Sequence, residues 1–388
     1  MKDSGAADVL SLRRHNLSLV LHHLRDHGQS SRIEVSADTG LGAGAVTSLV
    51  GELIGYGLAE EVGLRGTGSA GRPRRLLTLG HTSVAAVGVR LDPAFISVRV
   101  TDLAERERYH ERAPHGLRAP TADEMAKALA ERIIRAVGEW HGRTVSVVVA
   151  VPGWTDRGIV TSVPFGWRLA PLLPALREQL SPGIGPVALV NDGNLETWAE
   201  YQLLRLTGVR DLIYLAGGIG AGGGVVVDGR LVYGAHGAAG ELGHLEVEPG
   251  GLPCPCGRRG CLERYVSLRA LLDRSGIGEH ERGVEELADR AERRDAATLR
   301  ALQEAAERIH SVVMNARMLL NPQVVVLGGH FGRLVKWLGP VIAHDTLRVS
   351  PPFEVRAAGH ARDAALYGAT CFAVSAILDD PLLVTRPS

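Results

Sequence analysis

The sequence has few cysteines, few aromatic residues and no excess of charge. Only four of its 388 residues are cysteine, and Phe, Trp and Tyr together make up 4%. So few cysteines argue against a small extracellular fold held together by disulfides. The 43 basic residues balance the 43 acidic ones, so a surface that attracts a polyanion would have to be local.

Long apolar runs are also missing. No stretch of about 18 uncharged apolar residues occurs, which predicts that no helix spans a membrane. The N-terminal sequence MKDSGAADVLSLRRHN lacks the apolar core and the small-residue cleavage site of a signal peptide. We therefore expect a cytoplasmic protein. Its length allows two or three domains, and its 45% hydrophobic residues suffice for a sizeable core.

Three of the four cysteines lie close together within residues 237–263, GAAGELGHLEVEPGGLPCPCGRRGCLE. Cys254, Cys256 and Cys261 have the spacing C-x-C-x4-C, and His244 precedes them. Three cysteines and one histidine are typical of a structural zinc site, so we expect one Zn2+ per chain. The alternative is a disulfide with a spare thiol, which the low cysteine count disfavours. Cys371 is far from this cluster in the sequence and is expected to be a small core residue.

The same segment carries a family resemblance. Glu241-Leu-Gly-His244 followed by CPCGRRGCLE resembles two consecutive motifs of the ROK family, which contains sugar kinases and sugar-responsive transcriptional repressors. The resemblance implies an α/β body with an actin-like (ribonuclease H-like, sugar kinase/hsp70-type), duplicated fold over residues 81–388. One lobe would cover roughly 81–190 together with a C-terminal helix at 363–380, and the other 191–362.

The first 80 residues predict a helix-turn-helix. Apolar residues recur at i, i+3, i+4 and i+7 from Leu17, which predicts a helix over 10–27. The capping box Ser31-Arg-Ile-Glu34 opens a short second helix, and a turn at 39–41 follows. A second apolar stripe begins at Val46 and predicts a third helix. Three helices joined in this way are typical of DNA-binding domains.

The exposed face of the third helix is the expected base-reading surface. It contains no Arg, Asn or Gln that could bind a base with two hydrogen bonds. Its candidate DNA-binding residues are instead small: Ala43, Ala45, Thr47 and Ser48.

An arginine-rich hairpin is predicted after the third helix, from strands near 58–62 and 76–79 with a tip at 66–71. No acidic residue lies between Glu61 and Asp92, and Arg72 and Arg74 are candidate phosphate contacts. With the helices this hairpin predicts a winged helix-turn-helix over residues 1–80. The alternative is a solvated, arginine-rich linker. The ROK repressors carry such an N-terminal domain and the ROK kinases do not, so the resemblance favours binding to a palindromic double-stranded operator.

One segment departs from the pattern of the ROK kinases. These kinases hold ATP phosphate in a D-x-G-G-T-type loop after the first strand of the body. In this chain Arg90 replaces the acidic residue and Pro93 replaces a loop glycine. A phosphate-binding loop needs exposed backbone N–H groups, and proline has none. The sequence therefore predicts a non-catalytic body.

The resemblance also implies a sugar site. Asn191 and Asp192 follow a predicted buried strand and match the family's N-D-x-N motif, in which the Asp is the general base of the kinases. Asp192 would then be a vestigial base. The alternative is that Asn-Asp-Gly is only a turn. The complete sugar-binding set implied by the resemblance is Asn191, Asp192, Glu241, His244 and Glu263.

Three functions are compatible with these motifs. The first is a transcriptional regulator controlled by a sugar, sugar phosphate or amino sugar, which we expect to be a homodimer or homotetramer. The second is an ATP-dependent sugar kinase, which Asp192 supports. The third is a zinc-stabilised interaction module, which leaves the polar residues around Glu241 unexplained. The N-terminal domain and the altered phosphate loop favour the first function.

Overall fold

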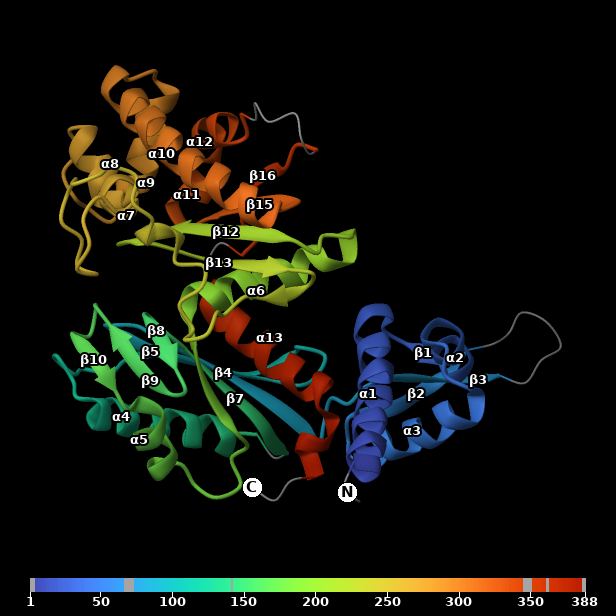
Figure 1. Ribbon diagram of the computed structural model, residues 1–388. Helices are drawn as coiled ribbons and strands as arrows, with labels where there is room; N and C mark the ends of the chain where they lie inside the picture. The colour runs from blue at the N-terminus through green and yellow to red at the C-terminus, as the bar shows by residue number, and fades with distance from the viewer. Residues whose placement is uncertain (1–3, 66–72, 141, 345–350, 361–362, 386–388) are drawn as a thin grey trace. The chain divides into compact units, whose positions relative to one another are not determined.

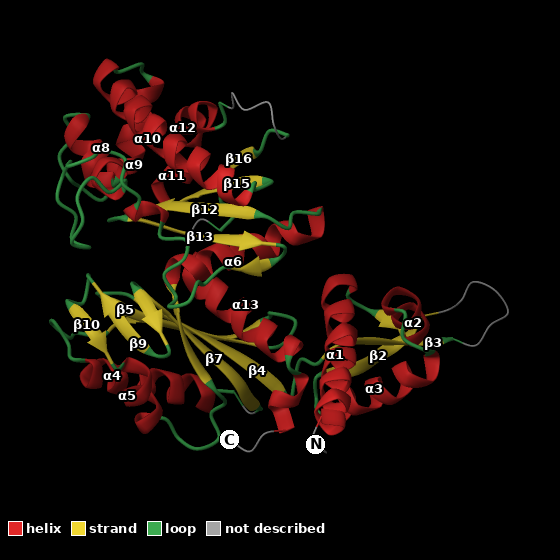
Figure 2. Cartoon of the chain, viewed as in Figure 1, coloured by secondary structure: helices red, strands yellow, loops and turns green. Residues whose placement is uncertain are grey.

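The computed structural model describes residues 4–65, 73–140, 142–344, 351–360 and 363–385. It divides into two compact units. Unit 1 consists of Met1–Ala150, Ala170–Leu189 and Ala369–Ser388, and unit 2 of Val151–Leu169 and Val190–Gly368. Figure 1 colours the chain from blue at the N-terminus to red at the C-terminus and labels most of the elements, and Figure 2 separates helices from strands by colour.

Unit 1 begins with three helices and a small antiparallel sheet of order β1-β3-β2. The elements are α1 (Ser4–His27), β1 (Ser30–Ser31), α2 (Arg32–Thr39), α3 (Ala43–Gly55), β2 (Ala59–Arg65) and β3 (Arg74–Leu79). The helix predicted over 10–27 starts earlier, at Ser4, because no helix-breaking proline precedes it. The predicted hairpin tip at 66–71 and Arg72 lie outside the described residues.

Local sequence signals explain how these helices begin and end. Ser31 Oγ accepts a hydrogen bond from the Glu34 amide, and the Ser31 amide donates to Glu34 Oε2 at 2.6 Å. This is the predicted capping box. Gly40 ends α2 with φ of 73°, a left-handed conformation that glycine adopts without strain. The predicted apolar stripes form the buried contact between α1 and α3: Leu17, Val20, Leu21, Leu24, Val46, Leu49, Val50 and Leu53.

The larger sheet of unit 1 has the order β11-β7-β4-β5-β6. Its strands are β4 (Val84–Leu91), β5 (Phe95–Thr101), β6 (Glu107–Pro114), β7 (Arg143–Val151) and β11 (Val187–Asn191). β4, β5 and β6 pair antiparallel, whereas β4 and β7 are parallel. The strands β4 and β7 are buried along almost their whole length, as expected for strands covered on both faces. The helices of this part are α4 (Ala122–Gly138), α5 (Leu172–Gln179) and, from Ala369 onward, α13 (Ala364–Asp379), which is followed by the short η3 (Pro381–Thr385).

Unit 2 repeats this strand pattern, with the order β14-β13-β12-β15-β16. β12 and β13 are antiparallel, whereas β12, β15 and β16 are parallel. The strands are β12 (Leu212–Gly217), β13 (Ala221–Val227), β14 (Arg230–Leu231), β15 (Val324–Gly328) and β16 (Glu354–Ala357). The repeated pattern agrees with the predicted duplicated α/β body. A further small sheet, order β10-β9-β8, is made by β8 (Trp154–Asp156), β9 (Ile159–Ser162) and β10 (Trp167–Ala170).

The helices of unit 2 enclose its main core. The apolar face of α10 packs with the sheet strands through buried residues such as Leu302, Ile309 and Val313. The helices are α6 (Asp192–Leu204), η1 (Arg205–Thr207), η2 (Leu242–His244), α7 (Glu263–Val266), α8 (Leu268–Arg274), α9 (Gly283–Glu292), α10 (Ala296–Leu320), α11 (Gly329–Arg333) and α12 (Val335–Ile342). Among the described helices, none combines the length and the hydropathy needed to cross a bilayer.

Candidate functional site

The cysteine segment is a series of tight backbone turns between η2 and α7. The Cys254 amide donates to Arg258 O at 2.8 Å, and the Gly257 amide donates to Cys254 O at 3.0 Å. Gly260 has φ of 72°, and a Cβ at this position would lie 1.9 Å from Glu248 O. Only glycine fits there, so the motif CGRRGC turns back on itself and its cysteines point to one centre.

The four donor atoms of His244, Cys254, Cys256 and Cys261 lie within 4.8 Å of one another. Cys254 Sγ is 3.6 Å from His244 Nδ1, and Cys256 Sγ is 3.7 Å from Cys261 Sγ. A tetrahedral ion with metal–sulfur distances of about 2.3 Å requires ligand atoms about 3.5–3.8 Å apart. These two distances fit that requirement. They do not fit a disulfide, whose sulfur atoms are about 2.05 Å apart, and all three cysteines are free.

Without a cation, two thiols of this cluster favour the protonated, neutral form. Burial raises the pKa of Cys254 and of Cys261 above the ordinary thiol value. The Cys254 thiol donates a hydrogen bond to Glu263 Oε1 at 2.9 Å, which favours the same protonated form. Because metals bind thiolates, a divalent cation here would displace these protons.

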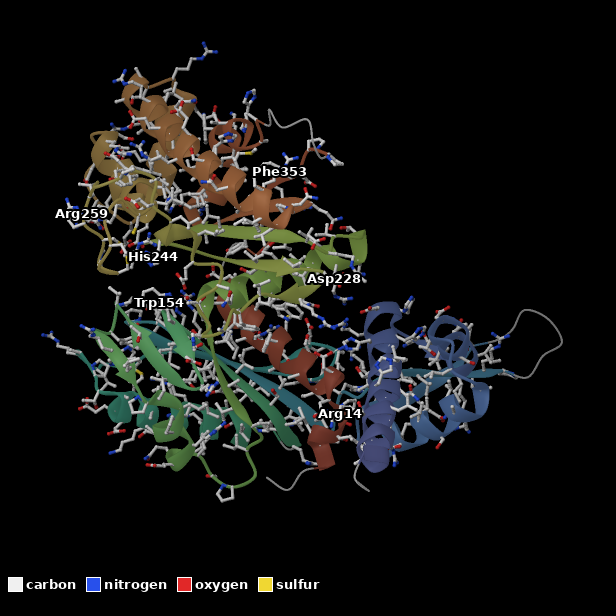
Figure 3. All side chains as sticks on the ribbon, in the orientation of Figure 1. Arg14, Trp154, Asp228, His244, Arg259 and Phe353 are labelled. Atoms are coloured by element: carbon white, nitrogen blue, oxygen red, sulfur yellow. The ribbon has the colours of Figure 1, made fainter. Side chains whose placement is uncertain are left out.

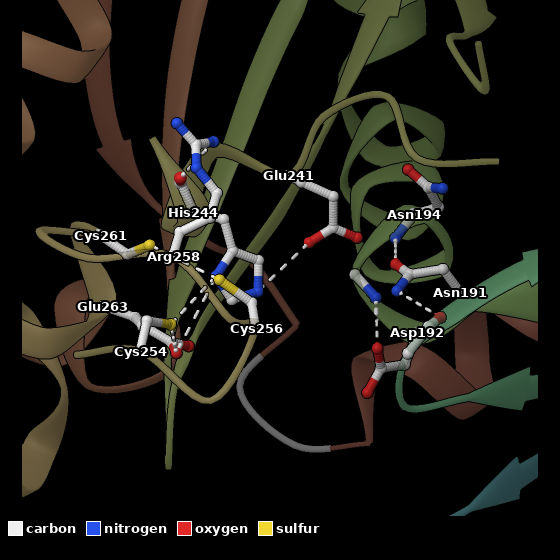
Figure 4. A network of polar contacts seen from close by, with 12 residues as sticks. Asn191, Asp192, Asn194, Glu241, His244, Cys254, Cys256, Arg258, Cys261 and Glu263 are labelled. Atoms are coloured by element: carbon white, nitrogen blue, oxygen red, sulfur yellow. Dashed lines mark hydrogen bonds and ion pairs between the residues drawn. The ribbon is translucent and has the colours of Figure 1, made fainter. Parts of the chain in front are cut away.

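His244 lies between two carboxylates, as Figure 4 shows. Its Nδ1 is 3.9 Å from Glu263 Oε1, and its Nε2 is 3.9 Å from Glu241 Oε2. Nδ1 is also the atom that faces Cys254. The two ring nitrogens therefore face different partners: Nδ1 faces the cysteine cluster, and Nε2 faces Glu241.

Glu241 has an unusual carboxyl group. Burial raises the pKa of Glu241 to about 7, and the negative charges of Asp192 and Glu263 act in the same direction. A hydrogen bond from the Trp154 side chain opposes this shift. At neutral pH the carboxyl can therefore either donate or accept a hydrogen bond. A cation at His244 would lower this pKa again, because it favours the charged form.

Asn191 and Asp192 lie where β11 passes into α6. Asn191 Oδ1 accepts from the Asn194 amide at 2.9 Å and caps α6, while its Nδ2 donates to Gly153 O at 2.9 Å. Asp192 Oδ1 accepts from the Gly193 amide at 2.9 Å. Asn-Asp-Gly is thus the start of a helix, and not the plain turn that was the alternative interpretation of this segment. Asn191 holds this helix start in position, and Asp192 is near enough to Glu241 to affect its pKa.

Two features of this region escaped the sequence analysis. The Trp154 ring lies 5.8 Å from the His244 ring, centroid to centroid, and both side chains are labelled in Figure 3. The glycine turn after β12 lies close to Glu263, since a Cβ on Gly220 would be 2.6 Å from Glu263 Oε2. The only sequence signal for Trp154 is its position directly after Pro152-Gly153 at the end of β7.

The turn at 92–94, which follows β4, is closed by its own hydrogen bonds. The Asp92 amide donates to Phe95 O at 3.0 Å, and the Ala94 amide donates to Asp92 Oδ1 at 3.0 Å. Pro93 has no N–H group. Arg90 pairs with Asp92 at 3.5 Å and lies 5.3 Å from the centre of the Phe95 ring. The backbone from 92 to 94 therefore has no N–H group left for a phosphate.

The candidate DNA-binding residues of α3 are all exposed, namely Ala43, Ala45, Thr47 and Ser48. Thr47 Oγ1 donates to Ala43 O at 2.9 Å. Arg74 is exposed at the start of β3. Two other arginines of the hairpin form ion pairs, Arg65 with Glu34 and Arg75 with Glu61. Arg74 is therefore the described hairpin arginine best placed to meet a new anion.

Comparison with proteins of known sequence found repressors and kinases. The chain is 28% identical to the xylose repressor of Bacillus spizizenii over 326 residues, which are 83% of each chain. It is 27% identical to the N-acetylmannosamine kinase of Haemophilus influenzae over 312 residues, 79% of this chain and 96% of the kinase.

Comparison with solved structures supports the fold. A ROK family transcriptional regulator, a homologue of the E. coli MLC protein, superimposes with a TM-score of 0.80 over 97% of this chain and 98% of its own, at 24% identity. The family model described as "ROK family" matches residues 86–376, which is most of the chain. This chain belongs to the ROK family.

Proposed function

We propose that this chain is a transcriptional repressor of carbohydrate-metabolism genes whose DNA binding is controlled by a sugar or sugar derivative. The observation that carries the proposal is the domain organisation of the chain. A body of a sugar kinase family follows an N-terminal group of three helices and a hairpin, and the family match begins only at residue 86. A kinase needs no such addition, whereas a repressor does.

The N-terminal group would be a winged helix-turn-helix over residues 1–80. α2 and α3 would form the helix-turn-helix, with α3 in the major groove, and β2 and β3 would form the wing. Ala43, Ala45, Thr47 and Ser48 would face base edges through methyl and hydroxyl groups. Arg74, together with Arg72, would contact phosphate.

The cysteine cluster would hold one structural Zn2+ through His244, Cys254, Cys256 and Cys261. Support comes from the donor set and from donor separations of 3.6 and 3.7 Å. When bound, the ion supplies no chemistry of its own but fixes the cysteine segment. His244 would use Nδ1 toward the cluster, so its Nε2 hydrogen remains available to a ligand.

The effector would bind beside this cluster. Asp192, Glu241 and Glu263 provide carboxylates that suit sugar hydroxyl groups, and His244 provides a donor. Asn191 would hold the start of α6 and Trp154 would add an aromatic face. Buried acceptors of this kind reject ligands that leave them unpaired, which is the physical basis for choosing one sugar over another.

Control of DNA binding follows from thermodynamic linkage. A homodimer or homotetramer that reads a palindrome must hold two winged helices about 34 Å apart, one helical turn of DNA. A sugar that binds one conformation of the body more tightly than another shifts the population of that conformation. If the two conformations differ in this spacing, the sugar changes operator affinity.

A sugar kinase is the second candidate. Asp192 supports it, because a carboxylate at this position could accept the proton of a sugar hydroxyl. The turn at 92–94 opposes it, because all of its backbone N–H groups are used within the turn or absent. We therefore expect sugar binding without efficient phosphoryl transfer.

One experiment separates the candidates. A thermal-shift panel of sugars with the full chain would first identify a ligand. Genomic DNA fragments retained by the full chain would then be sequenced with and without that sugar, with a chain lacking residues 1–80 as control. A repressor retains specific fragments, releases them with sugar, and loses them on truncation. Sugar phosphorylation at roughly 1–100 per second, without fragment retention, would favour the kinase instead.

A further inference from the structure

A second cluster of metal-binding residues lies in the N-terminal part of unit 1. His23 and His27 are one helical turn apart on α1, and Asp38 comes from α2. The two imidazole rings stack with centroids 4.4 Å apart, and His23 Nδ1 is 3.6 Å from Asp38 Oδ2. One ligand atom from each of the three residues lies within 4.8 Å of the others. Figure 1 shows α1 and α2 beside each other.

The hydrogen bonds leave ring nitrogens of both histidines for another partner. His27 Nδ1 lies 3.1 Å from His23 O, and because a carbonyl only accepts, this nitrogen carries the hydrogen. His27 Nε2 then has a lone pair, the arrangement typical of a metal-bound histidine. His23 is buried, and its Nε2 has no hydrogen-bond partner within the described parts of the chain. Its Nδ1 is farther from Asp38 than a normal hydrogen bond allows.

Charge at the cluster favours a cation. Three carboxylates lie near the His23 ring, those of Asp38, Glu34 and Asp26. Two of them have arginine partners: Glu34 pairs with Arg65, and Asp26 with Arg25. Asp38 pairs with His23 itself and is the carboxylate available to an ion.

We propose that His23, His27 and Asp38 form a second metal site, which binds a divalent transition-metal ion and joins α1 to α2. Two imidazoles and one carboxylate suit Zn2+, Ni2+ or Cu2+. Metal–nitrogen distances of about 2.0–2.1 Å place tetrahedral donor atoms about 3.3 Å apart, so the three donors must come closer together than they lie in the structure. His27 and Asp38 are both exposed, so their side chains can make this adjustment. Water would complete the coordination.

The position of Asp38 gives the site a structural effect. Asp38 precedes Gly40, the left-handed residue at which α2 ends before α3 begins. An ion shared by Asp38 and the histidines would hold the end of α2 against α1, and thereby the turn that leads into α3. This site has no sulfur ligands, and only one of its three residues is buried, whereas two of the four residues of the cysteine cluster are. Its ion should therefore exchange with solution more readily than an ion in the cysteine cluster.

The test uses the full chain as purified, with whatever metal its cysteine cluster retains, and adds Zn2+ in a calorimetric titration. Wild type is expected to bind one further ion per chain. His27→Ala and Asp38→Asn should each abolish this binding and keep the wild-type circular dichroism spectrum, because both side chains are exposed. His22→Ala is the matched control. It alters the neighbouring histidine of α1, whose ring bonds Asp379 at 2.7 Å, and should bind as wild type does.

Added Co2+ provides a readout specific to the ligand set. A site made of nitrogen and oxygen gives no thiolate charge-transfer band in the near ultraviolet, whereas binding to the cysteine cluster does. The proposal predicts uptake without that band. If wild type takes up no further ion, or if His27→Ala and Asp38→Asn bind it as tightly as wild type, the histidine stack is only a packing contact and the proposal is overturned. No operator or sugar enters this test, so its result is independent of the proposed function.

Discussion

His244 presents Nε2 to the carboxylate of Glu241, with Oε2 at 3.9 Å, while Nδ1 of the same ring faces the thiol of Cys254 at 3.6 Å. One imidazole thus links the predicted zinc cluster to the predicted sugar site. An ion bound at Nδ1 would hold the hydrogen on Nε2, because a metal-bound nitrogen carries no proton. The cluster would therefore fix both the orientation and the tautomer of a ligand-binding group.

The first prediction concerns the cysteine cluster. Wild-type protein should keep its metal during mild chelation, whereas Cys256→Ser should lose it, because the variant lacks one of the four ligands. The loss should also affect folding, because a zinc site forms together with the surrounding fold. The free energy of unfolding should fall by about 3 kcal/mol or more. Elemental analysis after dialysis and urea denaturation would measure the two effects. Cys371→Ser is the control, since Cys371 lies on α13 outside the cluster, and it should keep its metal. Wild-type protein that holds no metal after gentle purification would contradict this prediction.

The second prediction concerns the effector. Asp192→Asn and Glu241→Gln should lose the response to sugar and still bind operator, because each removes a charged acceptor from unit 2 and leaves residues 1–80 unchanged. Loss of a hydrogen bond to a charged group costs roughly 1.5–3 kcal/mol, which corresponds to about a 10- to 150-fold weaker sugar affinity. Operator titrations at increasing sugar concentration would measure it.

A matched control for these variants is Glu246→Gln, an exposed glutamate two positions after His244. It should respond to sugar as wild type does. If Asp192→Asn and Glu241→Gln also respond at the wild-type concentration, the effector binds elsewhere in the chain.

The third prediction concerns DNA. Arg74→Ala, alone and together with Arg72→Ala, should weaken operator binding and reduce its dependence on salt. Each lost phosphate contact should lower the slope of log affinity against log salt by about one. Fluorescence anisotropy at several salt concentrations would give this slope. Arg269→Ala, an exposed arginine on α8 of unit 2, should leave both affinity and slope unchanged. Equal slopes for wild type, Arg74→Ala and the double variant would mean that the hairpin does not contact phosphate.

The fourth prediction concerns acid stability. Burial lowers the pKa of His330 to about 4, and its Nε2 donates to Val266 O at 2.9 Å. The unfolded chain takes up this proton near pH 6.5, whereas the folded protein does so only near pH 4. Stability should therefore fall as the pH decreases from about 6.5 to 4, by up to about 3 kcal/mol from this residue.

His330→Gln, which retains a hydrogen-bond donor, should flatten this part of the pH profile. Urea denaturation at pH 5 and pH 7 would measure the difference. His310→Gln, on the half-buried face of α10, is the control and should keep the wild-type slope. A His330→Gln protein with an unchanged slope would show that other groups cause the acid sensitivity.

Local signals in the sequence were sufficient for much of the fold. The capping box at Ser31 and Glu34 and the apolar stripes of α1 and α3 act over a few residues, and the structure contains them as predicted. The continuous apolar runs of β7 and β15 are buried strands. Boundaries were less accurate: the first helix, predicted from residue 10, begins at Ser4. Helix ends depend on capping contacts that periodicity does not reveal.

The sequence by itself determined the family and the cysteine cluster, because short turns bring neighbouring cysteines together whatever the rest of the chain does. Tertiary structure decided which distant residues meet. Trp154 reaches His244 because β8 and the cysteine segment fold into one unit, and Asp38 reaches His23 because α2 packs on α1. Only folding revealed that Asn191 caps α6 and bonds Gly153. The physical reason is that contacts between elements depend on packing of buried faces, which no local pattern of residues specifies.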